Sequence, residues 1–143
     1  MRKVLAILAM ALLAGAPALA QKTNGEAATM RALGAPGLDG KPLAEAIAKA
    51  AAFPLGSKQN PVRANGPAGQ RAYLDRLRCA DGAKPTYDRA GNVGEGVYGY
   101  IVDDYRVTCP GKDEVRIYMD LYHVWVEDAA VPGFTIVPGR DAA

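Results

Sequence analysis

The sequence is poor in the residues on which most enzyme chemistry depends. It contains one histidine, His123, one serine, Ser57, and two cysteines. A covalent hydrolase needs a nucleophile that a neighbouring base activates, and Ser57 lies in the loop-like run PLGSKQN with no strand-to-helix elbow to expose it. One histidine without a closely spaced second ligand does not build the usual zinc site. The sequence therefore argues against covalent and metal catalysis, and it predicts no cofactor and no metal.

Long hydrophobic runs are absent after the first residues. Two basic residues precede an apolar stretch at residues 4–13, and small residues follow at positions 18–20. This is the pattern of a secretory signal peptide that is cleaved before Gln21, and its apolar stretch is too short to span a bilayer. We expect residues 1–20 to be removed and the remaining chain to be periplasmic or secreted, without membrane insertion.

An excess of one charge is also missing. The chain has 17 Lys+Arg and 15 Asp+Glu, and two of the bases lie in the expected signal peptide, so fifteen of each remain. A neutral domain has no general attraction for nucleic acid or anionic lipid. Bases are more frequent in residues 57–90 and acids in residues 94–129. We interpret this as two halves that face each other in one fold, with a basic partner-binding patch as the alternative.

The two cysteines, Cys79 and Cys109, both follow the expected signal peptide. Export and an even count predict a disulfide bond, with a reactive thiol as the alternative. Closing a loop of this size would stabilise a small domain by roughly 3 to 4 kcal/mol.

The remainder of the chain reads as one domain with short flanking segments. Residues 21–41 are rich in Gly and Ala and have no sustained hydrophobic face, so we expect a flexible tether. A single domain then spans residues 42–138, and residues 139–143 form a tail.

Two segments have the pattern of helices. The first begins at Pro42, has an apolar stripe, and ends before Pro54. The second runs over residues 67–79, and Asp81-Gly82 follows it as a stop signal.

Alternating apolar residues predict two strands, at residues 97–109 and 115–125, joined by a turn at residues 110–113. The run GFTIVP at residues 133–138 reads as a short edge strand. The expected fold class is α+β, with two helices packed on a small antiparallel sheet and one disulfide.

A glycine-rich run, GNVGEGVYGY, precedes the first of these strands. A phosphate-binding loop needs a strand before it and a helix after it, whereas this run leads into a β-rich stretch. It also lacks the ligands and the turn glycine of a calcium loop. We interpret it as a flexible turn or a bulged entry into a strand.

The run VRIYMDLYHVW holds the lone histidine. In a regular strand, Asp120 and His123 differ by an odd number and would point to opposite faces. Asp103 is the one acid on the otherwise apolar face of the preceding strand. We therefore predict a buried polar pair of Asp103 and His123 that specifies the strand register.

The other face of the same two strands carries tyrosines and arginines. If no helix covers that face, it would bind sugars, peptides or a partner protein; the alternative is that the aromatic residues cover their neighbours in the sheet. The candidate binding residues are Tyr98, Tyr100, Tyr118, Tyr122, Arg106 and Arg116.

The runs LGSKQNPVRANGPAGQRAYLDRLRC, GNVGEGVYGYIVDDYRVTCPG and IYMDLYHV resemble a group of small exported bacterial proteins of unknown function. The resemblance covers residues 55–134. It implies a periplasmic or secreted setting, and it assigns no activity and no catalytic residue.

Our leading hypothesis is a non-catalytic binding domain of the cell envelope, with an envelope protein or a glycan as partner. One alternative is an envelope hydrolase that uses the carboxylates Asp104 and Asp120. Another is an inhibitor of a secreted enzyme, which would present the loop at residues 91–96 to its target.

Overall fold

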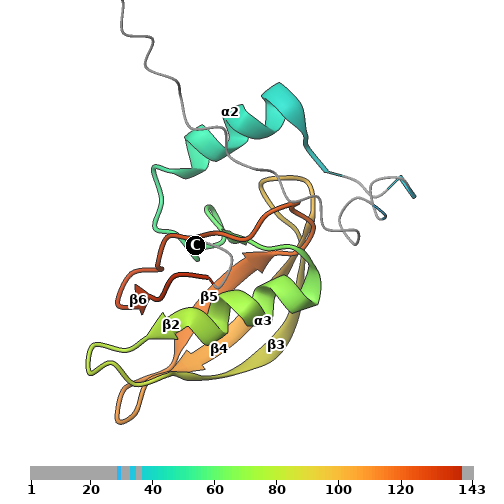
Figure 1. Ribbon diagram of the computed structural model, residues 1–143. Helices are drawn as coiled ribbons and strands as arrows, with labels where there is room; N and C mark the ends of the chain where they lie inside the picture. Colours follow the sequence, from blue (N-terminus) through green and yellow to red (C-terminus); the bar gives the residue numbers. More distant parts are fainter. Residues whose placement is uncertain (1–28, 30–32, 35–36, 140–143) are drawn as a thin grey trace, which may run out of the picture.

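The computed structural model describes residue 29, residues 33–34 and residues 37–139. The expected signal peptide, most of the expected tether and residues 140–143 of the expected tail lie outside the described residues. Over the described ranges the chain forms two helices, a four-stranded sheet and a two-stranded sheet (Figure 1). The α+β class is confirmed.

Both expected helices form, with different ends. Helix α2 spans Gly40–Ala50 and buries Leu43 and Ala50. Helix α3 spans Gly66–Arg76 and has a proline in its first turn, where the missing N–H costs nothing. Neither of these described helices is long and apolar enough to cross a membrane.

A pairing between distant parts of the chain ends α3 at Arg76, before the expected Cys79. The next residue, Leu77, is extended, and strand β2 (Leu77–Arg78) pairs antiparallel with β6 (Thr135–Ile136). This second sheet confirms the short strand expected within GFTIVP.

The main sheet is larger than expected and is mixed. Its order is β1-β5-β4-β3, and its strands are β1 (Val62–Arg63), β3 (Thr86–Glu95), β4 (Ile101–Thr108) and β5 (Val115–Asp120). Strands β3, β4 and β5 are antiparallel neighbours, whereas β1 joins β5 in parallel. The expectation of a purely antiparallel sheet is therefore wrong, because two residues of β1 are too few to give an alternating pattern.

The first half of the glycine-rich run, residues 91–95, lies in β3. Its register against β4 shifts between Arg89 and Gly91 and again between Asn92 and Glu95, so the bulged-strand interpretation is confirmed. The loop expected at residues 91–96 is thus strand up to Glu95. The chain then turns at Gly99, whose φ of 76° favours glycine, and this turn makes β4 begin at Ile101 instead of residue 97.

The helices cover different parts of the sheet. Helix α3 crosses one face, where Tyr73 and Leu74 pack with Tyr105, Ile117 and Met119 in the main core (Figure 1). Helix α2 lies apart from α3 and packs in a second cluster of buried residues. The two helices therefore do not share one face of the sheet.

The expected disulfide joins Cys79 and Cys109, whose Cα atoms are 5.9 Å apart. Cys79 directly follows β2 and Cys109 directly follows β4. The bond thereby ties the small sheet to the main sheet.

Candidate functional site

The only histidine contacts the aspartate three residues before it. His123 Nε2 lies 3.0 Å from Asp120 Oδ1, and both side chains are fully buried. Asp120 is the last residue of β5. Beyond it the chain leaves the strand, and the His123 N–H donates to Ala64 O at 3.0 Å. The expectation that these two side chains point to opposite faces is wrong, because strand alternation ends with the strand.

Asp103 has a different partner from the one expected. Its buried carboxylate accepts a hydrogen bond of 2.7 Å from Arg89 Nη2, on the neighbouring strand β3. Opposite Asp103 on β5 stands Met119, and His123 lies beyond the end of that strand. Both Asp103 and His123 are buried as expected, but the predicted pair between them does not form.

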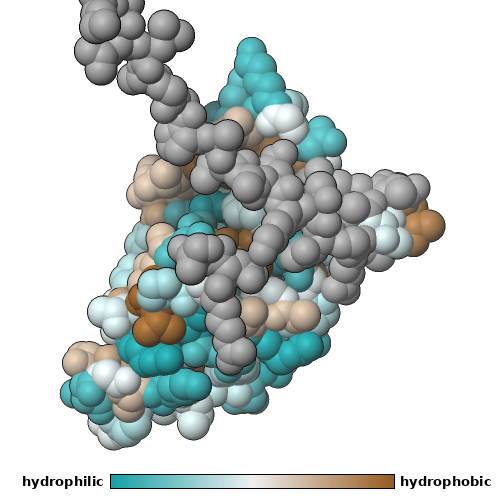
Figure 2. All heavy atoms as spheres, in the orientation of Figure 1, coloured by the Kyte–Doolittle hydropathy of each residue, from teal (hydrophilic) through white to brown (hydrophobic). Residues whose placement is uncertain are grey.

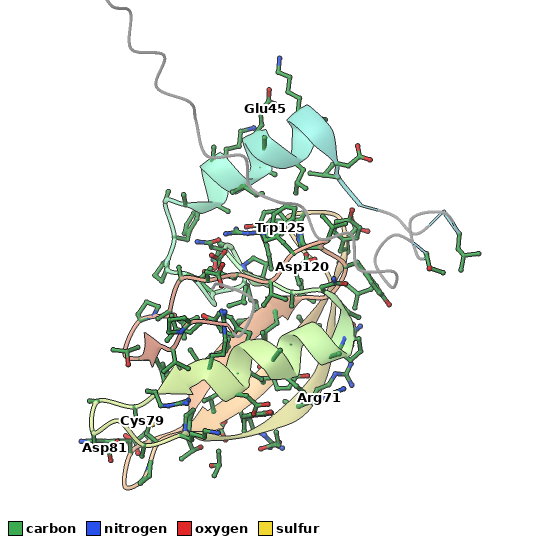
Figure 3. All side chains as sticks on the ribbon, in the orientation of Figure 1. Glu45, Arg71, Cys79, Asp81, Asp120 and Trp125 are labelled. Carbon is green, nitrogen blue, oxygen red and sulfur yellow. A yellow bond between two sulfur atoms is a disulfide. The ribbon has the colours of Figure 1, made fainter. Side chains whose placement is uncertain are left out.

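Aromatic rings enclose the His123 side chain. Its ring centroid lies 5.2 Å from that of Tyr98, 5.4 Å from that of Tyr100 and 5.1 Å from that of Trp125, and each ring is tilted edge to face. Figure 3 shows Asp120 and Trp125 between α2 and α3, with Trp125 nearer α2. The carboxylate oxygens of Asp120 and the ring nitrogens of His123 form no directed hydrogen bond with any described group, so the contact between the two side chains rests on proximity alone. A general base has to reach the proton that it abstracts, and this pair has no exposed surface.

The four tyrosines do not form an open platform, and this part of the binding-site prediction is corrected. Tyr98 and Tyr100 are buried, since α2 packs against them through Leu43 and Ala50. The Tyr98 hydroxyl accepts from Arg63 Nη1 at 3.0 Å and donates to an asparagine, and burial raises its pKa.

The two remaining tyrosines are half-buried, and the two candidate arginines are exposed. Tyr122 packs at the edge of the second cluster, and Lys58 Nζ lies 5.3 Å from the centre of the Tyr118 ring. Arg116 Nε donates to Asp104 Oδ1 at 2.8 Å, and Arg106 Nε donates to Asp88 Oδ2 at 2.9 Å. Arg106 and Arg116 stand opposite each other across β4 and β5, so each acid offsets a like-charge contact.

The candidate carboxylates are buried and engaged. Asp104 binds Arg116, and Asp120 contacts His123. In the part of the chain that the structure describes, no three His, Cys, Asp or Glu side chains gather into a set that would hold a metal ion.

Residues 54–59, which we call the ridge segment, line one groove, and the last of them borders a second. The first groove, of about 400 Å³, lies between the ridge segment, β5 and the turn at Val131 and Pro132. The second groove, of about 430 Å³, lies between α2, Phe53 and Val97, and Gln59 lines both grooves. Neither Asp104 nor Asp120 lines either of them.

Sequence reasoning missed these grooves. Phe53, Val97 and Val115 are large hydrophobic residues that stay exposed. Isolated apolar residues near turns give no periodic signal, and exposed apolar side chains are common on proteins. Only their gathering around one segment distinguishes them, and that gathering requires the fold.

Comparisons of this chain with protein-family models, with curated proteins and with solved structures find no match.

Proposed function

We propose that the protein is an exported, non-catalytic binding domain of the cell envelope, and that it binds its partner through the two grooves beside the ridge segment. One observation carries this proposal. Of the five large hydrophobic residues exposed in the described chain, Phe53, Val97 and Val115 all line these grooves. Apolar surface that gathers in hollows and is rimmed by polar residues is characteristic of interaction sites.

The polar residues at the second groove also support this proposal. On the face of the molecule drawn in Figure 2, hydrophobic residues form small areas among hydrophilic ones. The charged side chains at the second groove, Glu45 and Lys49, belong to the rim that α2 provides. A hydrophobic centre with a polar rim is the usual anatomy of a protein interface.

The buried Asp120–His123 pair supports a binding role over a catalytic one. Both side chains are fully buried, aromatic rings surround His123, and neither residue lines the grooves in which a substrate would lie. A buried polar pair of this kind contributes to a unique packing arrangement more readily than to chemistry on a substrate.

Site-specific photo-crosslinking in the producing cells tests the proposal. Benzoylphenylalanine is introduced in turn at Phe53, Val97 and Val115, and at Val93 as a control. Val93 is 43% exposed, against 42% for Val97 and 43% for Val115, but it lines neither groove. We expect crosslinked species from the three groove positions and none from the control. Equal crosslinking at Val93, or none at all in the grooves, would refute the proposed surface.

A further inference from the structure

Strand β5 has an unpaired edge beside the first groove. Strand β1 pairs with β5 only at Met119 and Asp120, and the Tyr118 N–H donates to Gly56 O of the ridge segment at 2.8 Å. In an antiparallel pair, alternate residues direct their backbone groups to opposite edges. The N–H and C=O of Arg116 therefore point to the same edge as those of Tyr118. No described residue forms a backbone hydrogen bond with them there.

The opposite edge of the sheet, formed by β3, is protected against pairing with another chain. Strand β3 is interrupted by two register shifts, and bulges of this kind prevent an edge from pairing with another chain. The pairing of β5 with β4 runs from Val115 to Asp120 without a shift. Strand β5 is thus regular at Arg116, the one residue of the strand whose outward backbone groups pair with no described residue, and an apolar groove lies beside it.

Charge restricts what this groove can accept. Lys58 and Arg116 are the only charged residues that line it, and both are cationic. Arg116 is bound to Asp104, while Lys58 lies over the Tyr118 ring and forms no ion pair with a described residue. The remaining lining residues are apolar or neutral. An occupant with one carboxylate among apolar side chains would match this arrangement.

We propose that the first groove binds an extended peptide segment of a partner protein, which adds to the edge of β5 as a further strand and places a carboxylate at Lys58. This inference rests on the proposed function and names its ligand class. Backbone hydrogen bonds to Arg116 supply affinity, and the apolar pocket and Lys58 supply selectivity, as in other cases of strand addition.

The test uses synthetic peptides and the exported protein with its disulfide intact. The probe is a blocked heptapeptide of alternating valine and threonine with a central glutamate. One matched peptide carries lysine in place of glutamate, and another carries N-methyl groups on its backbone. Binding is measured by calorimetry, and the exchange of the Arg116 amide is followed by NMR. The Val115 amide, which points toward β4, serves as the internal reference.

We expect the glutamate peptide to bind about tenfold more tightly than either matched peptide, since each lacks one class of contact. The Arg116 amide should become protected from exchange and the Val115 amide should not change. Lys58→Glu should reverse the preference between the glutamate and lysine peptides, whereas Lys112→Glu, in an exposed turn, should leave it unchanged.

Other occupants give different results. Equal binding of the N-methylated peptide would overturn strand addition. The proposal would also be overturned if the protein sediments as a dimer and its Arg116 amide is protected from exchange without any peptide. A second copy of the chain would then occupy the edge of β5. Competition by chitotetraose for the same groove would indicate a glycan instead. If crosslinks form at Val115 in cells but no peptide protects Arg116, this inference fails and the proposed function stands; if no groove position crosslinks, both fail.

Discussion

Removing the disulfide should cost this domain a large part of its stability. The bond closes a loop with a sequence separation of 30. The chain-entropy relation gives a loss of about 12 cal/mol/K for a loop of this length, which is about 3.6 kcal/mol at 25 °C. Marginally stable domains have only about 5 to 15 kcal/mol in total. The variant Cys79→Ala/Cys109→Ala should therefore unfold much more easily than the oxidised protein.

Urea denaturation measures this loss directly. Oxidised protein, protein reduced with a phosphine, and the double alanine variant are compared under the same conditions. In thermal unfolding of the same samples, the melting temperature of a domain of this size should fall by about 4 to 8 °C for each kcal/mol of stability lost. Cys79 is buried, so the reduced protein separates the loss of the crosslink from the loss of packing in the variant. A loss below about 1 kcal/mol in the reduced protein would refute the argument that the crosslink acts by restricting the unfolded chain.

Three further outcomes follow from particular residues. The exported protein should begin at Gln21, which mass spectrometry of the secreted form can show; retention of residues 1–20 would contradict export by cleavage. Gly99 and Gly82 have similar positive φ values, 76° and 82°, so alanine should be strained at both positions. Gly99→Ala should destabilise the protein more in urea unfolding, because only this substitution places a Cβ 3.1 Å from Gly37 Cα. Equal losses of stability would show that this contact does not matter. Burial, aided by a hydrogen bond to Asp75, raises the pKa of Tyr87 from 10.0 to about 12. The folded state therefore holds this proton more tightly, and the stability it contributes below pH 10 is lost between pH 10 and 12; an unchanged pH dependence in Tyr87→Phe would contradict this assignment.

Local patterns in the sequence predicted the elements that depend on neighbouring residues. The helix near Pro42 follows from its apolar stripe, and the disulfide follows from an even cysteine count in a chain that the sequence predicts to be exported. The two central strands follow from alternation, although both are shorter than expected. In each case the information lies within a few residues of the element itself.

Elements that depend on distant pairing could not be predicted. Strand β1 is two residues long and exists because it meets the end of β5. Helix α3 has signals to continue toward Asp81, yet it ends at Arg76 because the next residues pair with β6. Tertiary contacts override local propensity at such positions, and nothing in the local sequence marks them.

The histidine shows the same limit at the level of a single side chain. Its predicted partner followed from an alternation that holds only within a strand. An isolated bridge between Asn65 and Tyr122, and the backbone bond from His123 to Ala64, redirect the chain just after Asp120. Asn65 lies far away in the sequence, so the strand end that decides the partner of His123 is itself a tertiary feature.

One buried tyrosine, Tyr98, nevertheless supports the proposed binding surface, although it does not line it. Tyr98 donates its hydroxyl hydrogen to Asn60 Oδ1 at 3.2 Å, and Asn60 Nδ2 donates to Phe53 O at 3.0 Å. The backbone carbonyl of Asn60 accepts a hydrogen bond of 2.8 Å from the Gly56 N–H, and the backbone carbonyl of Gly56 accepts one from the Tyr118 N–H. These bonds fix both ends of the ridge segment, which lines the first groove and reaches the second at its last residue. Tyr98 is thus a positioning residue, because its hydroxyl binds Asn60, which fixes the segment against which a partner would pack.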